Sequence, residues 1–356
     1  MIFRLLLVVF LTACSSPAYY FQATSGQLKL MRARQDIQSI LDDPATDTEL
    51  SADLKAAEQI KAFAHSTLGL PDNGSYSSYV DVDAEALVWN VVATQEFSLQ
   101  AKQWCFLVAG CVPYRGFFNQ QKAMDSAVRL RKKDMDVVVS PAAAYSTLGW
   151  FEDPLLSTMI SGSDIRLAAY LIHELAHQRL YVKNDGAFNE AYASFVEETG
   201  VEMWLSSSQR HDDLLHWQQL QNASRDFANL IAGTRSELTG LYLSEESETV
   251  KRTRKSEIFI SLSKSYDRLR KEKWQGKPFY DSWFEQPLNN ARIALYDTYT
   301  GGQCAFRGLL DSTNGDLQEF HRLAELKSQL EKDEREMWLK QTCVTMSPSG
   351  EFKEKS

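Results

Sequence analysis

The stretch from His173 to Glu190, HELAHQRLYVKNDGAFNE, decides which fold and which chemistry this chain supports. Residues four apart in an α-helix point to the same side and lie about 6 Å apart along the axis. His173 and His177 can therefore bind one metal ion together, and Glu174 can reach a water molecule on that ion without being a ligand. An HExxH motif arises by chance in roughly one chain in a hundred of this size, so the surrounding sequence has to decide.

The sequence on both sides of this motif predicts two antiparallel helices. Ser163 and Asp164 supply helix-start chemistry, and the apolar, alanine-rich run LAAYLIHELAH that follows predicts a buried helix. Residues 183–186 (KNDG) form a strong turn signal, after which AFNEAYASFVEETGVEMWL resumes helical periodicity. The two histidines therefore lie on the first helix of a helical hairpin.

The geometry of such a hairpin predicts the third metal ligand. If the first helix ends near Tyr181 and the chain reverses through Gly186, Glu190 returns to about the level of His177 and faces the ion. Three protein ligands leave an open position for a water molecule, as in catalytic zinc sites. We therefore predict one zinc ion held by His173, His177 and Glu190.

Two further residues of the second helix have predicted roles beside the ion. Glu197 lies about 10 Å beyond Glu190 along the helix, past His173, where it can accept a hydrogen bond from a ligating imidazole. Ser194, four residues after Glu190, is the other candidate for such a contact. Glu197 also remains the alternative third ligand, although the hairpin geometry favours Glu190.

Composition and charge limit the class of protein. The chain has 356 residues, of which 44% are hydrophobic, and contains no internal repeat or low-complexity linker, so we expect one globular domain. A formal net charge of −9 argues against a nucleic-acid surface, which needs a concentrated basic face. We predict an α+β fold that is predominantly α-helical, with a small sheet next to the HExxH helix. Helices are expected at 26–41, 48–68 and from 163 to about 340, and strands within 86–99, 105–118 and 134–151.

The N-terminus reads MIFRLLLVVFLTACSS and is typical of a secretory signal. Its ending, from Leu11 to Cys14, resembles a bacterial lipobox, in which the cysteine thiol is lipidated and becomes the mature N-terminus. Ser15, rather than an aspartate, then implies sorting to the outer membrane, and we expect the lipid to anchor the chain on the periplasmic side. The expected organisation is a signal peptide (1–13), a lipidated tether (14–25), one domain (26–345) and a loose tail (346–356).

Four cysteines remain after lipidation. An oxidising periplasm allows disulfides, and Cys105 with Cys111 makes the favoured local pair, which leaves Cys304 and Cys343. None of these cysteines has the CxxC spacing of a structural zinc site, so thiolates are not expected to bind the metal.

The motif and its surroundings carry a resemblance to known families. HELAH followed by NEAYA resembles the glutamate-zincin metallopeptidases, which implies a zincin-like fold, zinc bound by His173, His177 and Glu190, and Glu174 as general base. Together with the lipobox, the segments CVPYRGFF, AYSTLGWFEDPLLST, FNEAYASFVEETG and NNARIALYDTY resemble the bacterial family of predicted aminopeptidases, over most of the mature chain.

The sequence departs from the large aminopeptidases in two respects. The twelve residues between His177 and Glu190 form a shorter gap than theirs, and Glu197 stands at the longer, thermolysin-like spacing. Their Gly-x-Met-Glu-Asn segment, which holds the free amine of a substrate, is absent. The first departure keeps Glu197 open as a ligand, and the second leaves exopeptidase action open.

Weaker assignments concern the substrate. Tyr299 is our first candidate for the donor to the tetrahedral oxyanion, with Tyr181, Tyr296 and His216 as competitors. The stretch 137–154 before the HExxH helix either pairs with a peptide backbone or is a buried strand and loop. Glu152 or Asp153 can bind an ammonium group, and the stretch 114–116 (YRG) either holds a carboxylate or forms a turn. His65, His211 and His321 are interpreted as packing or surface residues.

The function that we predict from the sequence is a zinc-dependent peptidase of the bacterial envelope that acts on peptide substrates and favours N-terminal residues. The alternative is a zinc-binding but non-hydrolytic lipoprotein that acts as a scaffold or binding module, and a metal-free helical lipoprotein is a weaker third. The glutamate at position 174 favours the enzyme, because a structural zinc ion needs no base there.

Overall fold

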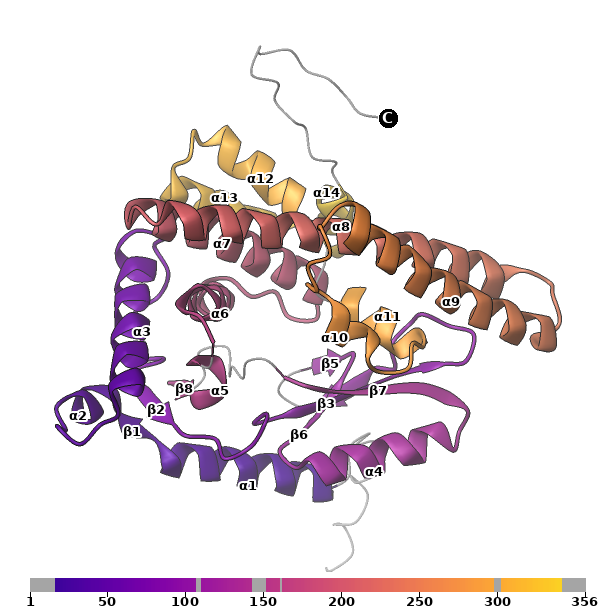
Figure 1. Cartoon of the computed structure of the whole chain (residues 1–356), viewed down its shortest axis with the longest axis horizontal. Coiled ribbons are helices and arrows are strands. Elements are labelled where there is room, and N and C mark those ends of the chain that lie inside the picture. Colours follow the sequence, from indigo (N-terminus) through magenta and orange to yellow (C-terminus); the bar gives the residue numbers. More distant parts are fainter. Residues whose placement is uncertain (1–16, 107–109, 143–151, 161, 298–301, 341–356) are drawn as a thin grey trace, which may run out of the picture.

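The computed structural model describes residues 17–106, 110–142, 152–160, 162–297 and 302–340. Helix predominates over strand, as the α+β prediction required (Figure 1). The helices are α1 (Pro17–Ala33), α2 (Ile37–Leu41), α3 (Thr48–Ser66), α4 (Gln120–Arg131), α5 (Ser157–Ile160), α6 (Asp164–Arg179), α7 (Gly186–Ser207), α8 (His211–Leu243), α9 (Glu248–Glu272), α10 (Asp281–Phe284), α11 (Asn290–Asp297), α12 (Gln303–Ser312), α13 (Leu317–Ser328) and α14 (Lys332–Leu339). The strands are β1 (Gln35–Asp36), β2 (Ser78–Val80), β3 (Trp89–Gln95), β4 (Trp104–Phe106), β5 (Gly110–Val112), β6 (Arg115–Phe117), β7 (Met135–Pro141) and β8 (Leu155–Leu156).

Helices α6 and α7 form the predicted hairpin, and local capping sets its ends. The Ser163 side chain accepts a hydrogen bond from the backbone of Arg166 at the start of α6. Asp185 caps α7 in the same way, by accepting from Phe188, and its carboxylate also binds the buried guanidinium of Arg335 at 2.8 Å. The short connection between the helices is therefore fixed from both sides.

The side chain of Asn189 stabilises this connection through two hydrogen bonds to the backbone of Val182. Its Oδ1 accepts from the Val182 amide at 2.8 Å, and its Nδ2 donates to the Val182 carbonyl at 2.9 Å. Asn184 adopts a φ of 62°, a left-handed conformation that asparagine tolerates better than most residues. The turn signal in the sequence thus has a direct structural counterpart.

The main core surrounds α6. In Figure 1 this helix is seen almost end-on, below α7 and beside α3. Buried side chains of α3, α6, α7, α12 and α13 belong to one cluster, which also includes Leu155 and Leu156 of β8. Gly200 of α7 is needed for this packing, because a Cβ there would lie 2.6 Å from a methyl group of Leu68. The expected position of α6 as a buried helix is confirmed.

The strands make three small sheets. One has the order β6-β3-β7 and is antiparallel, one has the order β1-β2-β8 and is mixed, and β4 pairs with β5 in a hairpin. Alternate residues of β3 face opposite sides, as the strand period requires. Val91 and Ala93 pack with Ala123 and Ala127 of α4, whereas Val92 packs with Ala291 of α11. The β6-β3-β7 sheet is thus covered by a different helix on each face.

Helix α1 differs from the sequence expectation. We expected a tether as far as residue 25 and a helix from 26 to 41, but α1 begins at Pro17 and ends at Ala33. Buried Gln22 donates to the carbonyl of Gly116 at 3.5 Å and accepts from the amide of Phe118 at 3.2 Å. These contacts with distant β6 hold residues 17–25 against the domain, and a short strand at β1 then separates α1 from α2.

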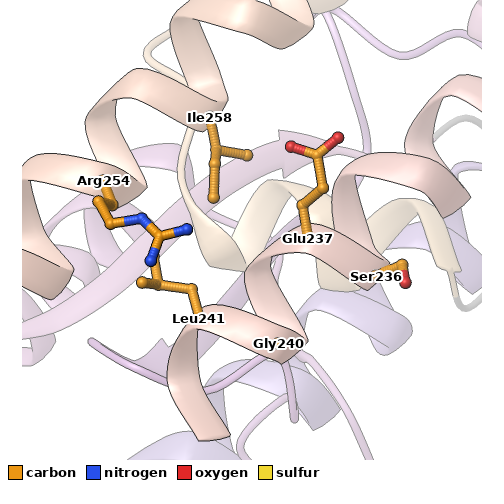
Figure 2. Close-up of a pocket in the computed structure, with 6 residues that line it drawn as sticks. All are labelled: Ser236, Glu237, Gly240, Leu241, Arg254 and Ile258. Atoms are coloured by element: carbon orange, nitrogen blue, oxygen red, sulfur yellow. The ribbon is translucent and has the colours of Figure 1, made fainter. Parts of the chain in front are cut away.

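The pair α8–α9 extends from the body of the molecule (Figure 1). A hollow of about 300 Å³ lies between these two helices, with Glu237 and Leu241 on one side and Arg254 and Ile258 on the other (Figure 2). No helix in the described part of the chain combines the length and the apolar character needed to cross a bilayer.

Candidate metal centre

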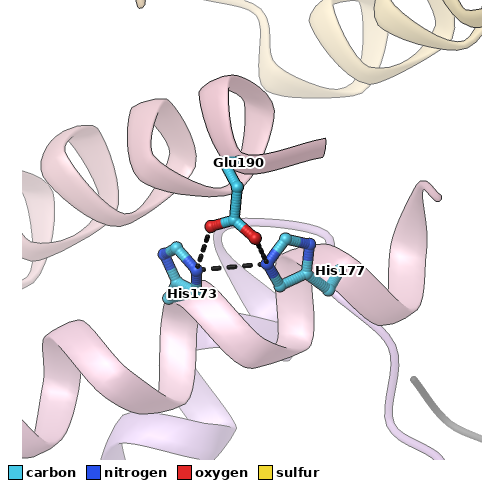
Figure 3. A group of neighbouring side chains, drawn as sticks. All are labelled: His173, His177 and Glu190. Carbon is cyan, nitrogen blue, oxygen red and sulfur yellow. Dashed lines mark hydrogen bonds and ion pairs between the residues drawn. The ribbon is translucent and has the colours of Figure 1, made fainter. Parts of the chain in front are cut away.

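The structure brings His173, His177 and Glu190 together between α6 and α7 (Figure 3). The Nε2 atoms of the two histidines are 3.1 Å apart. Glu190 faces both rings, with Oε2 at 3.5 Å from Nε2 of His173 and Oε1 at 3.6 Å from Nε2 of His177. Three candidate ligand side chains from two neighbouring helices therefore converge, and each histidine faces a different oxygen of Glu190.

The spacing of these atoms fits a zinc ion. Ligands about 2.0 to 2.1 Å from a tetrahedral zinc ion are about 3.3 Å from one another. The three observed separations, 3.1, 3.5 and 3.6 Å, lie close to that value. The donor set, two imidazoles and one carboxylate, is also the set found in one class of catalytic zinc sites.

Two polar atoms of the cluster are buried without a hydrogen bond among the described residues, Nδ1 of His177 and Oε2 of Glu190. Leaving such groups unpaired costs free energy, so most buried polar atoms in proteins have a partner. A cation between the three side chains would satisfy Oε2. The residues present therefore fit a metal ion, and two imidazoles with one carboxylate are a donor set that zinc accepts.

The electrostatics of the two histidines differ. Burial alone would lower the pKa of His173, but the adjacent carboxylates of Glu190 and Glu197 raise it well above its ordinary value. Burial and the neighbouring charge of His173 lower the pKa of His177 to about 4. The positive charge of the pair therefore lies on His173, next to the carboxylates of Glu190 and Glu197.

Glu197 makes the contact expected of a residue that orients a ligating histidine. Its Oε2 lies 2.9 Å from Nδ1 of His173, while Nε2 of the same ring faces Glu190. The side chain of Glu197 therefore points at the outer edge of the ring rather than at the cluster. Ser194, one turn after Glu190, makes no hydrogen bond to either histidine among the described residues, so its role stays a prediction.

Comparison with known families gives a match over residues 18–339 to the model described as Putative aminopeptidase. The match covers nearly all of the described chain. The chain belongs to this aminopeptidase family. No curated protein and no solved structure matched the chain.

In this member of the aminopeptidase family, one residue near the cluster was not foreseen. Burial first, and then the charges of Glu190 and Glu174, raise the pKa of Tyr114 to about 12, so both carboxylates act on its hydroxyl. The stretch that contains it was interpreted as a turn or a carboxylate site. The sequence carries no signal for its placement, because Tyr114 lies between β5 and β6, far along the chain from α6.

The disulfide-bonded hairpin β4–β5 explains how Tyr114 reaches the site. Cys105 and Cys111 are joined across the hairpin, as predicted. The amide of Cys111 donates to Oδ1 of Asn184 at 3.4 Å, so the hairpin contacts the connection between α6 and α7. Tyr114 follows Cys111 by three residues and packs beside Val92 and Ala291.

The competing tyrosine and histidine assignments separate in the structure. Burial and then the charge of Glu190 raise the pKa of Tyr181, whose side chain is 43% exposed. Tyr296 instead packs 5.1 Å from the ring of Phe227, in the aromatic cluster beneath α8 and α9. His216 is exposed on α8. Tyr299 lies outside the described residues, so its predicted role is untested.

The predicted ammonium and carboxylate sites are not part of the cluster. Glu152 is exposed beside Gly74, and Asp153 is buried with its carbonyl bonded to the amide of Tyr76. The guanidinium of Arg115 stacks on the ring of Tyr19, 4.1 Å from its centre, which favours a packing role. Residues 143–151 of the proposed substrate strand lie outside the described residues.

His321 has the packing role that we predicted, and Cys304 is in a disulfide bond. His321 is buried between the hydroxyl of Tyr192 and the carbonyl of Leu68, both at 2.8 Å. Cys304 is disulfide-bonded. Its predicted partner Cys343, and the predicted lipid site Cys14, lie outside the described residues, so both remain predictions.

Proposed function

We propose that this protein is a zinc-dependent aminopeptidase of the bacterial cell envelope. The observation that carries the proposal is the convergence of His173, His177 and Glu190 in a chain of the aminopeptidase family. When bound, zinc would polarise a peptide carbonyl and lower the pKa of a water molecule. The zincin-like character of the domain is part of the same proposal.

Glu174 acts as the general base. It takes a proton from the attacking water molecule and returns it to the leaving amine. It follows His173 directly on α6, and its charge acts on both His173 and Tyr114, so it lies at the edge of the cluster rather than inside it. Its proton can therefore move without loss of a metal ligand.

Glu197 keeps His173 in the required tautomer. A carboxylate that accepts the proton of Nδ1 leaves the lone pair of Nε2 free for the metal. The 2.9 Å contact to Nδ1 supports this role for Glu197, with Glu190 as the third ligand.

Tyr114 donates a hydrogen bond to the carbonyl oxygen as negative charge develops on it. A phenol with a pKa near 12 keeps its proton at neutral pH, so it is available as a donor. Tyr181 is the competitor among the described residues, and Tyr299 is the candidate from the sequence.

Membership of the aminopeptidase family supports removal of single residues from the N-terminus of peptides rather than internal cleavage. Attachment to the outer membrane through a lipid on Cys14 is proposed on the lipobox alone. The alternative function, a zinc-binding scaffold without hydrolysis, shares the metal centre and differs only in the need for Glu174.

The deciding experiment is the variant Glu174→Gln, tested with zinc analysis and with free-amine and N-blocked peptides. For Glu174→Gln, the proposal expects full zinc content and loss of hydrolysis. For the wild-type chain, it expects hydrolysis of free-amine peptides only. The matched control is Glu58→Gln, an exposed glutamate of α3, which should keep both zinc and activity. A wild-type chain that binds zinc but hydrolyses no peptide would leave the scaffold function instead.

A further inference from the structure

Helices α1 and α4 each expose large apolar side chains. Both helices lie along the lower edge in Figure 1. Phe21 is 76% exposed and Leu28 is 50% exposed on α1, and Met124 and Val128 are 42% and 47% exposed on α4. Phe21 and Leu28 are seven residues apart, so they share one face of α1, about 100° around the helix from the buried Gln22. These residues point away from the core of the domain.

The same two segments are strongly basic. Residues 17–34 and 119–134 contain eight lysine and arginine residues and two aspartates, a net charge of +6 in a chain of net charge −9. None of these eight basic side chains forms an ion pair with another residue of the described part. The basic residues are Lys29, Arg32, Arg34, Lys122, Arg129, Arg131, Lys132 and Lys133. An acidic protein thus presents one basic surface, which fits an anionic partner.

The predicted lipid site lies next to this surface. Pro17, the first residue of α1, follows Cys14 by three residues, and three residues of chain span at most about 10 Å. Phe21 lies four residues further, about 6 Å along the helix. A lipid on Cys14 would therefore hold the start of α1 within a short distance of the lipid headgroups.

We propose that the outer face of α1 and α4 lies on the surface of a phospholipid bilayer with anionic headgroups. Phe21 and Leu28 insert between the headgroups, and the lysine and arginine side chains of α4 bind the phosphates. The proposal deepens the proposed function, since it rests on the attachment of a lipid at Cys14. It gives the enzyme a fixed orientation on the membrane instead of a loose tether.

The exposed apolar residues of the α8–α9 pair provide the contrast. Leu243 is 81% exposed and Ile260 is 55% exposed, yet the nearby charges are of both signs and include the ion pair of Arg254 with Glu246. This surface lacks the basic excess of α1 and α4. It therefore supplies matched control positions for the test.

The test uses the mature lipidated protein in vesicles of phosphatidylethanolamine and phosphatidylglycerol, at about one chain per vesicle to exclude contacts between chains. A fluorophore is attached to the variants Phe21→Cys, Val128→Cys and Leu243→Cys, with the unsubstituted chain as the labelling background. We expect the labels at 21 and 128 to be protected from iodide and quenched by brominated lipid, and the label at 243 to remain open to iodide. Equal access of iodide to all three labels would overturn the proposal.

Charge reversal tests whether the basic side chains of α4 bind the lipid phosphates. Lys132→Glu with Lys133→Glu should lower the protection of the label at Phe21→Cys several-fold, whereas Lys264→Glu with Lys271→Glu on exposed positions of α9 should leave it unchanged. Protection that persists in both charge-reversed chains and in phosphatidylcholine vesicles would contradict an anionic surface. These readouts need no peptidase activity, and the mass of the purified chain reports the lipid, so failure of the metal centre or of the anchor is seen separately.

Discussion

The polar residues of the candidate metal centre on α6 and α7 face each other inside the core, whereas charged residues of α8 and α9 are exposed to solvent. His177 is 6% exposed and lies against Glu190 in the first pair. In the second pair, half-exposed Arg254 forms an ion pair with Glu246 at 2.7 Å. Both pairs are consecutive antiparallel helices, so the difference lies in their burial and not in their topology.

The comparison teaches where a functional site should be sought. Glu237 and Arg254 line the hollow between α8 and α9, and Arg254 forms an ion pair with Glu246 (Figure 2). Surface ion pairs of this kind contribute little to stability. The α6–α7 cluster instead brings two imidazoles and one carboxylate together, with Oε2 of Glu190 buried and without a hydrogen bond. The candidate metal centre is therefore identified by its converging ligand side chains and not by a cavity.

The largest effect is expected from the loss of a ligand. His177→Ala should abolish zinc binding and lower kcat/KM by about a thousandfold or more, because the ion supplies most of the charge stabilisation. Arg254→Ala, at the hollow between α8 and α9, should leave zinc content and kcat/KM unchanged. The reverse pattern would place the active site in the hollow. Zinc analysis, peptide hydrolysis and circular dichroism of both variants check this.

A smaller effect is expected from Tyr114→Phe. Loss of one oxyanion donor lowers kcat by about a hundredfold while zinc content stays full. The control is Tyr296→Phe, in the aromatic cluster beneath α8 and α9, which should retain the wild-type kcat. If Tyr114→Phe retains kcat and Tyr181→Phe loses it, the donor is Tyr181 instead.

Glu197→Gln should weaken zinc binding by about ten- to a hundredfold, because His173 loses the carboxylate that orients its ring. Competition with a chelator measures this. Glu237→Gln, at the edge of the hollow, is the matched control and should bind zinc as the wild type does. Complete loss of zinc in Glu197→Gln, with retention in Glu190→Gln, would exchange the two roles.

The smallest effect concerns acid stability in the core beneath α7. Burial lowers the pKa of His321 to about 4, below the value of about 6.5 in an unfolded chain. The native state therefore favours the neutral ring, and this stability is complete above pH 6.5 and is lost as the pH falls towards 4. We expect the free energy of unfolding to fall by about 1 to 2 kcal/mol between pH 7.5 and 5. Urea titrations of His321→Gln should show a flatter dependence, and an equal slope in both chains would contradict the assignment.

The sequence predicted those features that depend on local signals. The helix expected at 48–68 is α3 (Thr48–Ser66), and the KNDG turn falls between the end of α6 at Arg179 and the start of α7 at Gly186. Helix periodicity and turn chemistry act over a few residues, so a single sequence contains them. The convergence of His173, His177 and Glu190 followed from that local geometry.

Features that depend on distant contacts were not predictable. Residues 17–25 form helix because Gln22 binds Gly116 and Phe118, more than 90 positions away. The charge of Glu190 acts on Tyr114, which follows a hairpin that contacts Asn184. No spacing in the sequence encodes either contact, since both depend on how separate elements pack in three dimensions.

The central claim is that a single zinc ion is held between α6 and α7 by two imidazoles and one carboxylate. X-ray absorption at the zinc edge, on the folded chain loaded with zinc and then dialysed, tests it most directly. The account predicts one tightly held zinc ion per chain, with nitrogen and oxygen neighbours and the signature of two imidazole rings. A chain that retains no zinc, or a zinc ion with sulfur neighbours or without imidazole, would contradict it.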